Sequence, residues 1–390
     1  MKILMIAPEP FFEPRGTPFS EYFRIKALCA LGHKVDLVTY PIGTDKEIPG
    51  LRIIRSWKPF FIKSVKTGPS FVKIILDFFL FFSAFGRVIR GKKTYHLIHT
   101  HEEANIMGVF FNKLTRIPHL YDMHSSLVQQ MNNFQYTRST IIRGLMKKME
   151  KTVLLNASSV IVICRALFDY AAGITDESKL VIIENFIDDG TENLDGRKIE
   201  LVKEELAEPG KKIIMYTGTL EAYQGIPLLI DSMNFLSPDF QLVLIGGNPS
   251  QVDKLHKSVI EKNLHNKVRL LGRKDPSDIP YFLKNADVLV SPRTLGTNIP
   301  LKIYSYLKSG VPVVATDLFT HTQSLNHDIA ILVKPEPQEL ARGIETAVSK
   351  IGQETAKRAR AFCDRNYSYQ RYLDLVRDAL RIAAKETNSG

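Results

Sequence analysis

Short apolar runs of strand length alternate along this chain with longer segments of helical period. A first series of runs occupies residues 2–8, 35–40, 97–102, 119–124 and 160–164, and a second series occupies residues 213–218, 242–247, 268–272, 288–292 and 311–316. Strands that alternate with helices in this way are typical of parallel α/β architecture. The pattern therefore predicts two α/β units, one after the other.

The stretch between the two series, residues 186–198, is rich in Asp, Gly and Asn and is the best candidate for a linker. A chain of 390 residues is long for a single core, and its length favours two domains of roughly 150 to 200 residues. In open α/β sheets, ligands bind beyond the carboxyl ends of the strands. Two such Rossmann-like domains that face each other would enclose an interdomain cleft.

The first helix is predicted from Phe19 to Leu31, between the first two strands. Thr17 can cap this helix, Pro18 suits its first position, and Gly32 can end it. Gly16 lies in the preceding turn, where a glycine lets backbone N–H groups approach an anion. The alternative is that Gly16 serves only a tight turn.

Charge separates the two halves of the chain. Residues 1–180 hold 25 Lys and Arg against 14 Asp and Glu, and 27 of each kind follow, so the first half carries the whole net charge of +11. Such a field should draw the first domain toward an anionic surface, whether lipid, nucleic acid or an acidic substrate. The scattered Cys29, Cys164 and Cys363 indicate neither disulfides nor a zinc site, and the N-terminus resembles a buried strand rather than a signal peptide. We therefore expect a cytoplasmic protein.

Residues 52–93 combine basic and aromatic side chains, with Asp77 as the single acid. The apolar stretch from Phe71 to Phe85 is too short and too charged to cross a bilayer of roughly 30 Å. An interfacial helix with the basic anchors Lys63, Lys66 and Lys73 is one interpretation, and an internal core helix is the other. Nucleic-acid binding is disfavoured, because the Phe residues are consecutive rather than spread along a groove.

A second anion-binding loop is predicted before the helix that contains Lys302. Gly296, Thr297 and Asn298, followed by Pro300, would aim the helix N-terminus at the cleft. Backbone donors, the helix dipole and a fixed cation can together stabilise a diphosphate leaving group without a metal. The alternative for Lys302 is a solvated surface lysine. Ser305 would share its helical face, and further candidates to balance the diphosphate are Arg293 and Arg273.

Taken together, these motifs resemble the family 4 retaining glycosyltransferases. The similar pieces, in order, are the glycine loop at Gly16, the strand entry at 32–35, His124 after its strand, and the segments at 184–188, 218–225, 244–249, 268–272 and 292–316. The resemblance implies the GT-B fold, with residues 1–185 on the acceptor side and residues 186–365 on the donor side. It also implies that a C-terminal helix, residues 366–388, packs back on the first domain.

The resemblance assigns roles to particular residues. It implies that His124 reaches the transferred sugar and that Lys302 and Arg293 act on the leaving group. The residues that it places at the donor are Gly16, Thr17, Gly218, Thr219, Gln224, Arg273, Gly296, Thr297, Asn298 and Ser305. The sequence departs from the family at several of these positions. Thr297 and Ser305 stand where typical members carry two glutamates, and Thr219 and Gln224 replace an Arg and a Lys; hydroxyls and amides supply neither charge nor a bidentate grip.

The histidines His96, His99 and His101 invite a metal interpretation. Strand alternation puts His99 and His101 on one face, but a third ligand would have to come from elsewhere. We therefore expect no metal and place His101 on the acceptor side of the active site. Paired acids such as Glu102 and Glu103 are adjacent, so they point apart and disfavour a two-carboxylate hydrolase.

The sequence thus predicts a retaining, metal-independent glycosyltransferase that needs no cofactor beyond its co-substrate. It would move a hexosyl unit from a UDP- or GDP-sugar to a lipid-linked or glycan acceptor in polysaccharide or glycolipid synthesis. We expect it at the inner face of the membrane as a peripheral protein. The alternatives are a nucleotide-sugar epimerase of the same fold and a non-catalytic sugar-nucleotide-binding relative.

Overall fold

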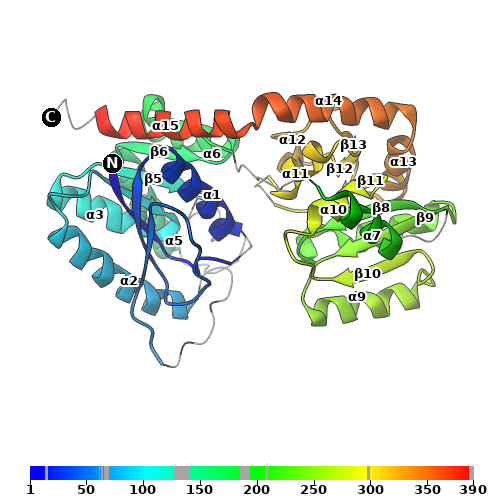
Figure 1. Cartoon of the computed structure of the whole chain (residues 1–390), viewed down its shortest axis with the longest axis horizontal. Coiled ribbons are helices and arrows are strands. Elements are labelled where there is room, and N and C mark those ends of the chain that lie inside the picture. The colour runs from blue at the N-terminus through cyan, green and yellow to red at the C-terminus, as the bar shows by residue number, and fades with distance from the viewer. Residues whose placement is uncertain are drawn as a thin grey trace. The chain divides into compact units, whose positions relative to one another are not determined.

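The computed structural model describes residues 1–13, 16–60, 62, 65, 70–126, 140–184, 194–206, 210–296 and 299–385. The chain divides into two compact units, which Figure 1 shows with their elements labelled. Unit 1 comprises Met1–Phe186 and Tyr369–Gly390, and unit 2 comprises Ile187–Ser368. The last part of the chain therefore belongs to unit 1.

Unit 1 is built on a seven-stranded parallel sheet with the order β3-β2-β1-β4-β5-β6-β7. Its strands are β1 (Lys2–Ala7), β2 (Lys34–Thr39), β3 (Leu51–Arg55), β4 (Leu97–His101), β5 (His119–Met123), β6 (Ser159–Val162) and β7 (Leu180–Ile182). Its helices are α1 (Gly16–Ala30), α2 (Phe71–Arg90), α3 (Asn105–Thr115), α5 (Thr140–Asn156), α6 (Arg165–Ala172) and α15 (Tyr369–Lys385), with 3-10 turns η1 (Glu102–Ala104) and η2 (Glu177–Lys179). The strand order reverses between β1 and β4.

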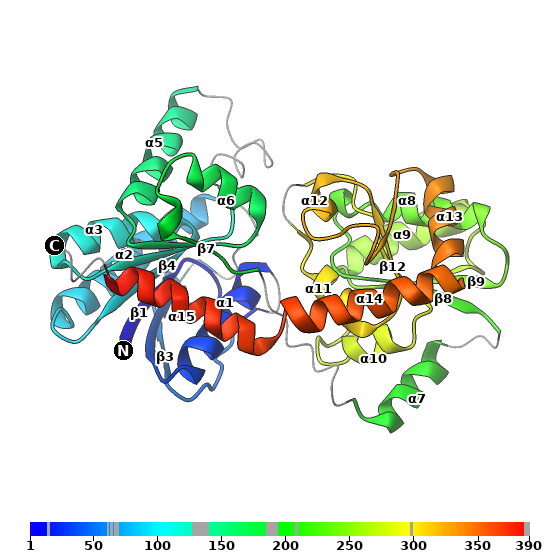
Figure 2. The same ribbon diagram turned by 90° about the horizontal axis from the view of Figure 1, so that it is seen from above.

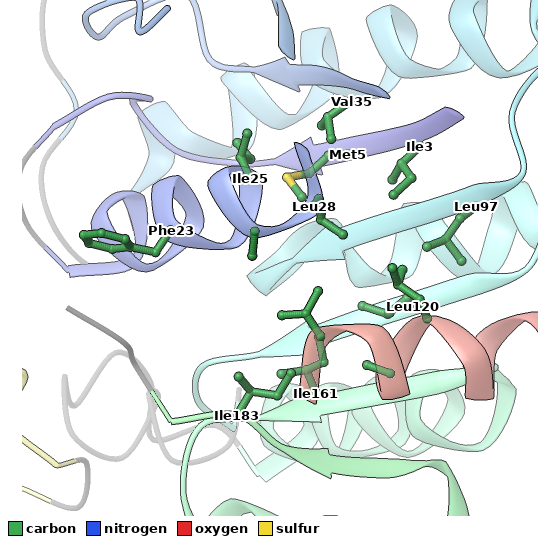
Figure 3. Packing of buried hydrophobic residues seen from close by; sticks show 14 of the residues in the cluster. Ile3, Met5, Phe23, Ile25, Leu28, Val35, Leu97, Leu120, Ile161 and Ile183 are labelled. Carbon is green, nitrogen blue, oxygen red and sulfur yellow. The ribbon is translucent and has the colours of Figure 1, made fainter. Parts of the chain in front are cut away.

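Each face of this sheet carries its own apolar core. On one face, α1 and α15 lie side by side and cover side chains of β1, β5 and β6 (Figures 2 and 3). This core includes Ile3, Leu120 and Ile161 of the strands together with Val376 and Leu380 of α15. On the other face, α2 and α3 pack together over β1, β2 and β4. Strands that are buried on both faces explain why the runs in the sequence are continuously apolar.

Unit 2 repeats the same plan with a six-stranded parallel sheet in the order β10-β9-β8-β11-β12-β13. Its strands are β8 (Lys212–Thr217), β9 (Phe240–Ile245), β10 (Val268–Gly272), β11 (Val288–Ser291), β12 (Val313–Thr316) and β13 (Ile331–Val333). Its helices are α7 (Gly196–Leu206), α8 (Ile226–Ser232), α9 (Pro249–Glu261), α10 (Ile279–Lys284), α11 (Lys302–Ser309), α12 (Phe319–Thr322), α13 (Pro337–Ala347) and α14 (Lys350–Asn366), with 3-10 turns η3 (Ala222–Gln224) and η4 (Met233–Phe235). Here the strand order reverses between β8 and β11.

Two local predictions were wrong. Helix α1 begins at Gly16 rather than Phe19, so Thr17 lies in the first turn and does not cap the helix. Its hydroxyl instead donates to Glu102 Oε1 at 3.4 Å, a contact from a distant part of the chain that helix-capping rules do not contain. The predicted linker also extends too far, because α7 begins at Gly196. Residues 185–193 lie outside the described ranges.

The apolar stretch that begins at Phe71 forms α2, which is longer than the predicted run. Ser70 accepts a hydrogen bond from the backbone N–H of Lys73 and caps the helix, while Arg87 and Arg90 suit the negative end of the helix dipole. No helix in the described ranges combines the length and the apolar character that crossing a bilayer requires.

Candidate functional site

Unit 2 gathers polar side chains where its strand order reverses. The loop after β8 leads to η3, and the loop after β11 leads to α11, so both lie at the carboxyl edge of the two central strands. In doubly wound sheets this point is the usual ligand site, because the adjacent helices depart to opposite faces and leave a crevice. Most of the predicted donor-binding residues belong to these two loops.

Lys302 begins α11 and turns its ammonium toward the loop after β8. Its Nζ lies 3.3 Å from Oε1 of Gln224 and 3.6 Å from the centre of the Tyr216 ring. Gln224 in turn donates to Thr219 Oγ1 at 3.4 Å. Within the described ranges, no carboxylate pairs with Lys302. Burial, and then the positive charge of Arg293, lower the pKa of Lys302 well below its usual value.

Arg293 follows β11 and supplies the second cation. Its guanidinium donates to Thr320 Oγ1 at 2.8 Å and lies 5.0 Å from the centre of the Tyr223 ring. Burial lowers the pKa of Arg293, as it does for Lys302. Two neighbouring, partly buried cations repel each other, and an anion that binds between them would relieve the repulsion. This arrangement therefore suits a phosphate or diphosphate.

Glycines keep the carboxyl edge open beside these cations. Gly218 has a φ of +137°, and a Cβ there would lie 3.0 Å from Lys302 Nζ. Gly246 has a φ of +129°, and a Cβ would lie 1.8 Å from the Gly218 carbonyl oxygen, so any other residue would separate the two loops. Gly296 lies against the Arg293 guanidinium, because a Cβ added to Gly296 would lie 3.4 Å from that group.

The structure thus brings together Gly218, Thr219, Gln224, Arg293, Gly296 and Lys302. Ser305 is partly buried one turn after Lys302, whereas Arg273 is exposed after β10, with β9 between its strand and β8. Thr297 and Asn298 lie outside the described residues. Sequence reasoning missed Tyr216 and Tyr223. Tyr216 stands within the recognised strand of β8, so only its place near the carboxyl end could have indicated it.

Unit 1 has a buried polar cluster toward the carboxyl ends of β4 and β5. Asp122 on β5 lies beside His101 on β4 in the sheet register. Its Oδ2 is 2.8 Å from Arg24 Nε and 3.5 Å from His99 Nε2, and its Oδ1 is 3.3 Å from His124 Nε2. Burial opposes ionisation of Asp122, but the Arg24 cation holds the pKa of this carboxyl well below its usual value. Asp122 is therefore a carboxylate.

The histidines of the cluster differ in charge. Burial lowers the pKa of His99 and holds that of His101 well below its usual value, so both rings are neutral near pH 7. Burial also lowers the pKa of His124, but the carboxylates of Asp122 and Glu102 outweigh it and raise the net value. His124 is therefore the ring of this cluster that is most easily protonated.

The three histidines that invited a metal interpretation do not come together, since His96 is exposed and accepts a hydrogen bond from the backbone N–H of Lys2. In the described part of the chain, ligand atoms of His99, His101 and Asp122 lie within 4.8 Å of one another. A cation there would compete with Arg24 for the same Asp122 oxygen, and like charges in a buried site repel strongly. The geometry thus favours the ion pair over a metal.

Further acids surround the cluster. Glu102, in η1, has a φ of +44° and accepts hydrogen bonds from Thr17 at 3.4 Å and Ser125 at 3.3 Å. It thereby links the loops after β1, β4 and β5. Glu9 and Glu21 are buried next to each other, and burial raises the pKa of Glu21 to about 7 and that of Glu9 well above its usual range. One of these two carboxyls therefore keeps a proton near neutral pH.

Known proteins provide an independent indication of what this architecture is. Residues 24–190 match the family model described as Glycosyltransferase Family 4, and residues 198–362 match the one described as Glycosyl transferases group 1. The two models cover most of unit 1 and most of unit 2 in turn. The chain belongs to the family 4 glycosyltransferases.

Among curated proteins, this glycosyltransferase is similar to an uncharacterized glycosyltransferase of Methanocaldococcus jannaschii, with 25% identity over 216 residues. The match covers 53% of the present chain, which spans about half (52%) of that relative's length. The family assignment confirms the resemblance seen in the sequence.

Solved structures extend the likeness over the whole chain. Sucrose-phosphate synthase from Thermosynechococcus elongatus gives a TM-score of 0.76 at 20% identity. The match covers 97% of the present chain and 98% of the synthase chain. HepE of Anabaena, solved with UDP, gives 0.75 at 18% identity over 100% of both chains. At such low identity the likeness establishes the fold alone, and it confirms the predicted GT-B fold of two Rossmann-like domains.

The buried carboxyl of Glu21 should make the stability of this glycosyltransferase depend on pH. The folded state keeps a proton on Glu21 up to its raised pKa of about 7, whereas the unfolded chain releases it near the ordinary pKa of 4.5. The free energy of unfolding should then fall as pH rises between these values. We expect Glu21→Gln to be more stable than the wild type at pH 8 by roughly 1 to 3 kcal/mol, with no gain at pH 4.

Urea unfolding of unit 1 at both pH values measures this difference. The matched control is Glu47→Gln, because Glu47 is exposed in the same unit and should show no such pH-dependent gain. If Glu21→Gln is no more stable than the wild type at pH 8, then ionisation of Glu21 does not lower the free energy of unfolding and the prediction is wrong.

Proposed function

We propose that this protein transfers a hexosyl unit from a nucleoside diphosphate sugar to a hydroxyl of a membrane-associated or glycan acceptor, with retention of configuration. The observation that carries the proposal is the pair of basic side chains, Lys302 and Arg293, where the strand order of unit 2 reverses; burial lowers the pKa of both, and a bound diphosphate would favour their charged forms. HepE, which has the same fold, has been solved with UDP and with UDP-glucose. UDP-sugars are therefore the first donors to test, and GDP-sugars the second.

The proposed chemistry needs no protein nucleophile. The bond between the anomeric carbon and the diphosphate oxygen breaks, the acceptor oxygen bonds to the same face of that carbon, and the acceptor proton passes to the departing diphosphate. Lys302 and Arg293 stabilise the charge that develops on the leaving group. Backbone N–H groups at the start of α11 add to this stabilisation, since an anion suits a helix N-terminus. His124 hydrogen-bonds the transferred sugar.

The proposed acceptor follows from the surface of unit 1. Helix α2 exposes large apolar side chains along one stripe, and α3 continues it where Phe81 of α2 contacts Phe110 of α3 at 5.7 Å between ring centres. We call this surface the apolar stripe; its residues are Phe71, Ile74, Phe78, Phe82, Ile89, Ile106, Phe110 and Leu114. So large an apolar surface on a monomer usually marks a docking site.

Charge selects a lipid surface as the partner of the apolar stripe. Asp77, the only acid of α2, accepts a hydrogen bond from the Tyr40 hydroxyl at 2.6 Å, which draws it away from the stripe. Exposed cations at the ends of α2 and α3 are Arg90, Lys92, Lys93, Lys113 and Arg116. Apolar side chains flanked by cations bind anionic bilayers. We infer peripheral attachment at the inner face of the membrane, with a lipid-linked acceptor in polysaccharide or glycolipid synthesis.

The predicted membrane anchors need a correction. Lys73 is turned toward Glu103, with 3.9 Å between Nζ and Oε1, and its side chain is only 20% exposed. The helical period places Lys73 on the same face of α2 as the buried Leu76 and Leu80. Lys73 therefore lies nearer to the buried side of the helix than to the apolar stripe. Lys63 and Lys66 lie outside the described residues.

The function itself is tested with a panel of UDP- and GDP-sugars incubated with the protein and crude membrane lipid, followed by mass spectrometry. We expect one donor to disappear together with formation of a glycosylated lipid. Conversion of one nucleotide sugar into another would identify an epimerase instead. Binding of a donor without turnover would identify a non-catalytic relative.

Lys302→Ala should lower the transfer rate by about a hundredfold while the fold persists, because one leaving-group contact is worth several kcal/mol. Lys308→Ala, in the last turn of the same helix, is the matched control and should keep the wild-type rate. Initial rates of UDP release, with circular dichroism as the folding check, decide the outcome. An unchanged rate in Lys302→Ala would remove this lysine from the mechanism.

Transfer should persist in excess EDTA, because the cations of unit 2 take the role of a divalent metal at the diphosphate. The measurement is the rate of UDP release before and after dialysis against the chelator. Activity that disappears and returns with Mn²⁺ or Mg²⁺ would contradict this part of the mechanism.

The apolar stripe should govern membrane binding. Wild-type protein should pellet with vesicles that contain phosphatidylglycerol, dissociate in part above about 0.5 M salt as screening increases, and ignore neutral vesicles. Replacing Phe78, Phe82 and Phe110 by Ser should abolish pelleting but leave UDP binding unchanged. Phe235→Ser, at an exposed Phe of unit 2, is the control and should still pellet. Wild-type protein that ignores anionic vesicles at low salt would favour a soluble acceptor.

A further inference from the structure

The ion pair between Arg24 and Asp122 is the most deeply buried ion pair in the described part of the chain. The two side chains are 3% and 0% exposed, and Arg24 Nε lies 2.8 Å from Asp122 Oδ2. Removing two charges from water costs several kcal/mol each, so such a pair is weak evidence for a role in stability. Its geometry indicates another role.

The two oxygens of Asp122 have different partners. Arg24 and His99 approach Oδ2, whereas His124 Nε2 lies 3.3 Å from Oδ1. His101 is also on the Oδ2 side, at 4.0 Å, and its ring stacks on His99 with 4.8 Å between ring centres. Arg24 fixes Oδ2 and so restricts rotation of the carboxylate, which keeps Oδ1 beside His124 Nε2 without a well-aligned hydrogen bond between them.

Arg24 is itself fixed from the far side. The ring of Tyr372, on α15, lies with its centre 5.2 Å from the guanidinium carbon. Tyr372 is buried in the same apolar core as the residues of α1. A guanidinium against an aromatic face gains cation–π attraction, which is strongest where water is excluded. Tyr372 of α15 thus contacts Arg24 of α1, Arg24 pairs with Asp122 of β5, and Asp122 lies beside the ring of His124.

We propose that Asp122, oriented by Arg24, is a positioning residue whose carboxylate favours a proton on Nε2 of His124 and so makes Nδ1 the nitrogen that meets the transferred sugar. This inference rests on the proposed function, in which His124 contacts that sugar. A carboxylate beside one ring nitrogen favours the tautomer of the neutral imidazole that carries its proton on that nitrogen. Charged and titratable groups that face His124 besides Asp122 are Glu9, Glu102, His99 and His101.

The test is a pH titration of full-length protein labelled with ¹⁵N-histidine, followed by long-range ¹H–¹⁵N correlation, with His124→Gln to assign the signals. In the wild type, neutral His124 should carry its proton on Nε2. In Asp122→Asn its pKa should fall by about one unit or more, because an opposite charge within a few ångströms shifts a pKa by one to three units. Asp36→Asn, at another buried acid of the same sheet, is the matched control and should leave His124 unchanged.

Asp122→Asn leaves the Arg24 charge buried, and the variant can fail to fold for that reason alone. The double variant Arg24→Met with Asp122→Asn removes both charges and provides a second test with the same expected fall in the His124 pKa. Wild-type His124 with its neutral proton on Nδ1, or a His124 pKa unchanged in a folded variant, would overturn the proposal. The titration needs no acceptor, whereas transfer by His124→Gln tests the proposed function, so each can fail without the other.

Discussion

All strands within each sheet run parallel, and this single constraint determines where chemistry can occur. Parallel strands bring their carboxyl ends to the same edge, and the helices that follow the two central strands leave toward opposite faces. Backbone donors and side chains therefore meet at that edge without a ligand-specific fold. In unit 2 the edge carries Lys302 and Arg293, and in unit 1 it carries His124 and Glu102.

The two edges have opposite character although the sheets share one strand order. The edge of unit 2 is cationic and aromatic, with tyrosine rings beside each cation, and it suits an anionic leaving group. The edge of unit 1 is rich in carboxyl groups, although the unit as a whole carries the basic excess. The excess positive charge lies on the surface, including the ends of α2 and α3. The positive excess of unit 1 thus lies apart from the carboxyl groups of its edge.

Much of the fold could be predicted from the sequence, because doubly buried strands give continuous apolar runs that are easy to recognise. The loops of the candidate site in unit 2 were also predictable, since Gly218 and Gly296 lie next to such runs and Lys302 begins the helix that follows. The Arg24–Asp122 pair was not. Arg24 lies in a helix with no unusual sequence feature, and its partner Asp122 lies 98 residues away along the chain. A long-range polar contact leaves no periodic signal in the sequence. Thr17 looked like a helix cap for the same reason, since its partner Glu102 lies 85 residues away.

Helix α15 has a consequence for how the chain is made. Tyr372, Val376 and Leu380 complete an apolar core whose other members, among them Ile3 and Leu120, are synthesised hundreds of residues earlier. On the ribosome, unit 2 has all of its strands before unit 1 has its last helix. The part of the first sheet that α15 covers, at β5, β6 and β7, therefore stays uncovered until α15 is made, and uncovered apolar sheet surface is prone to aggregation. The apolar core of unit 1 is therefore completed only after α15 has been synthesised.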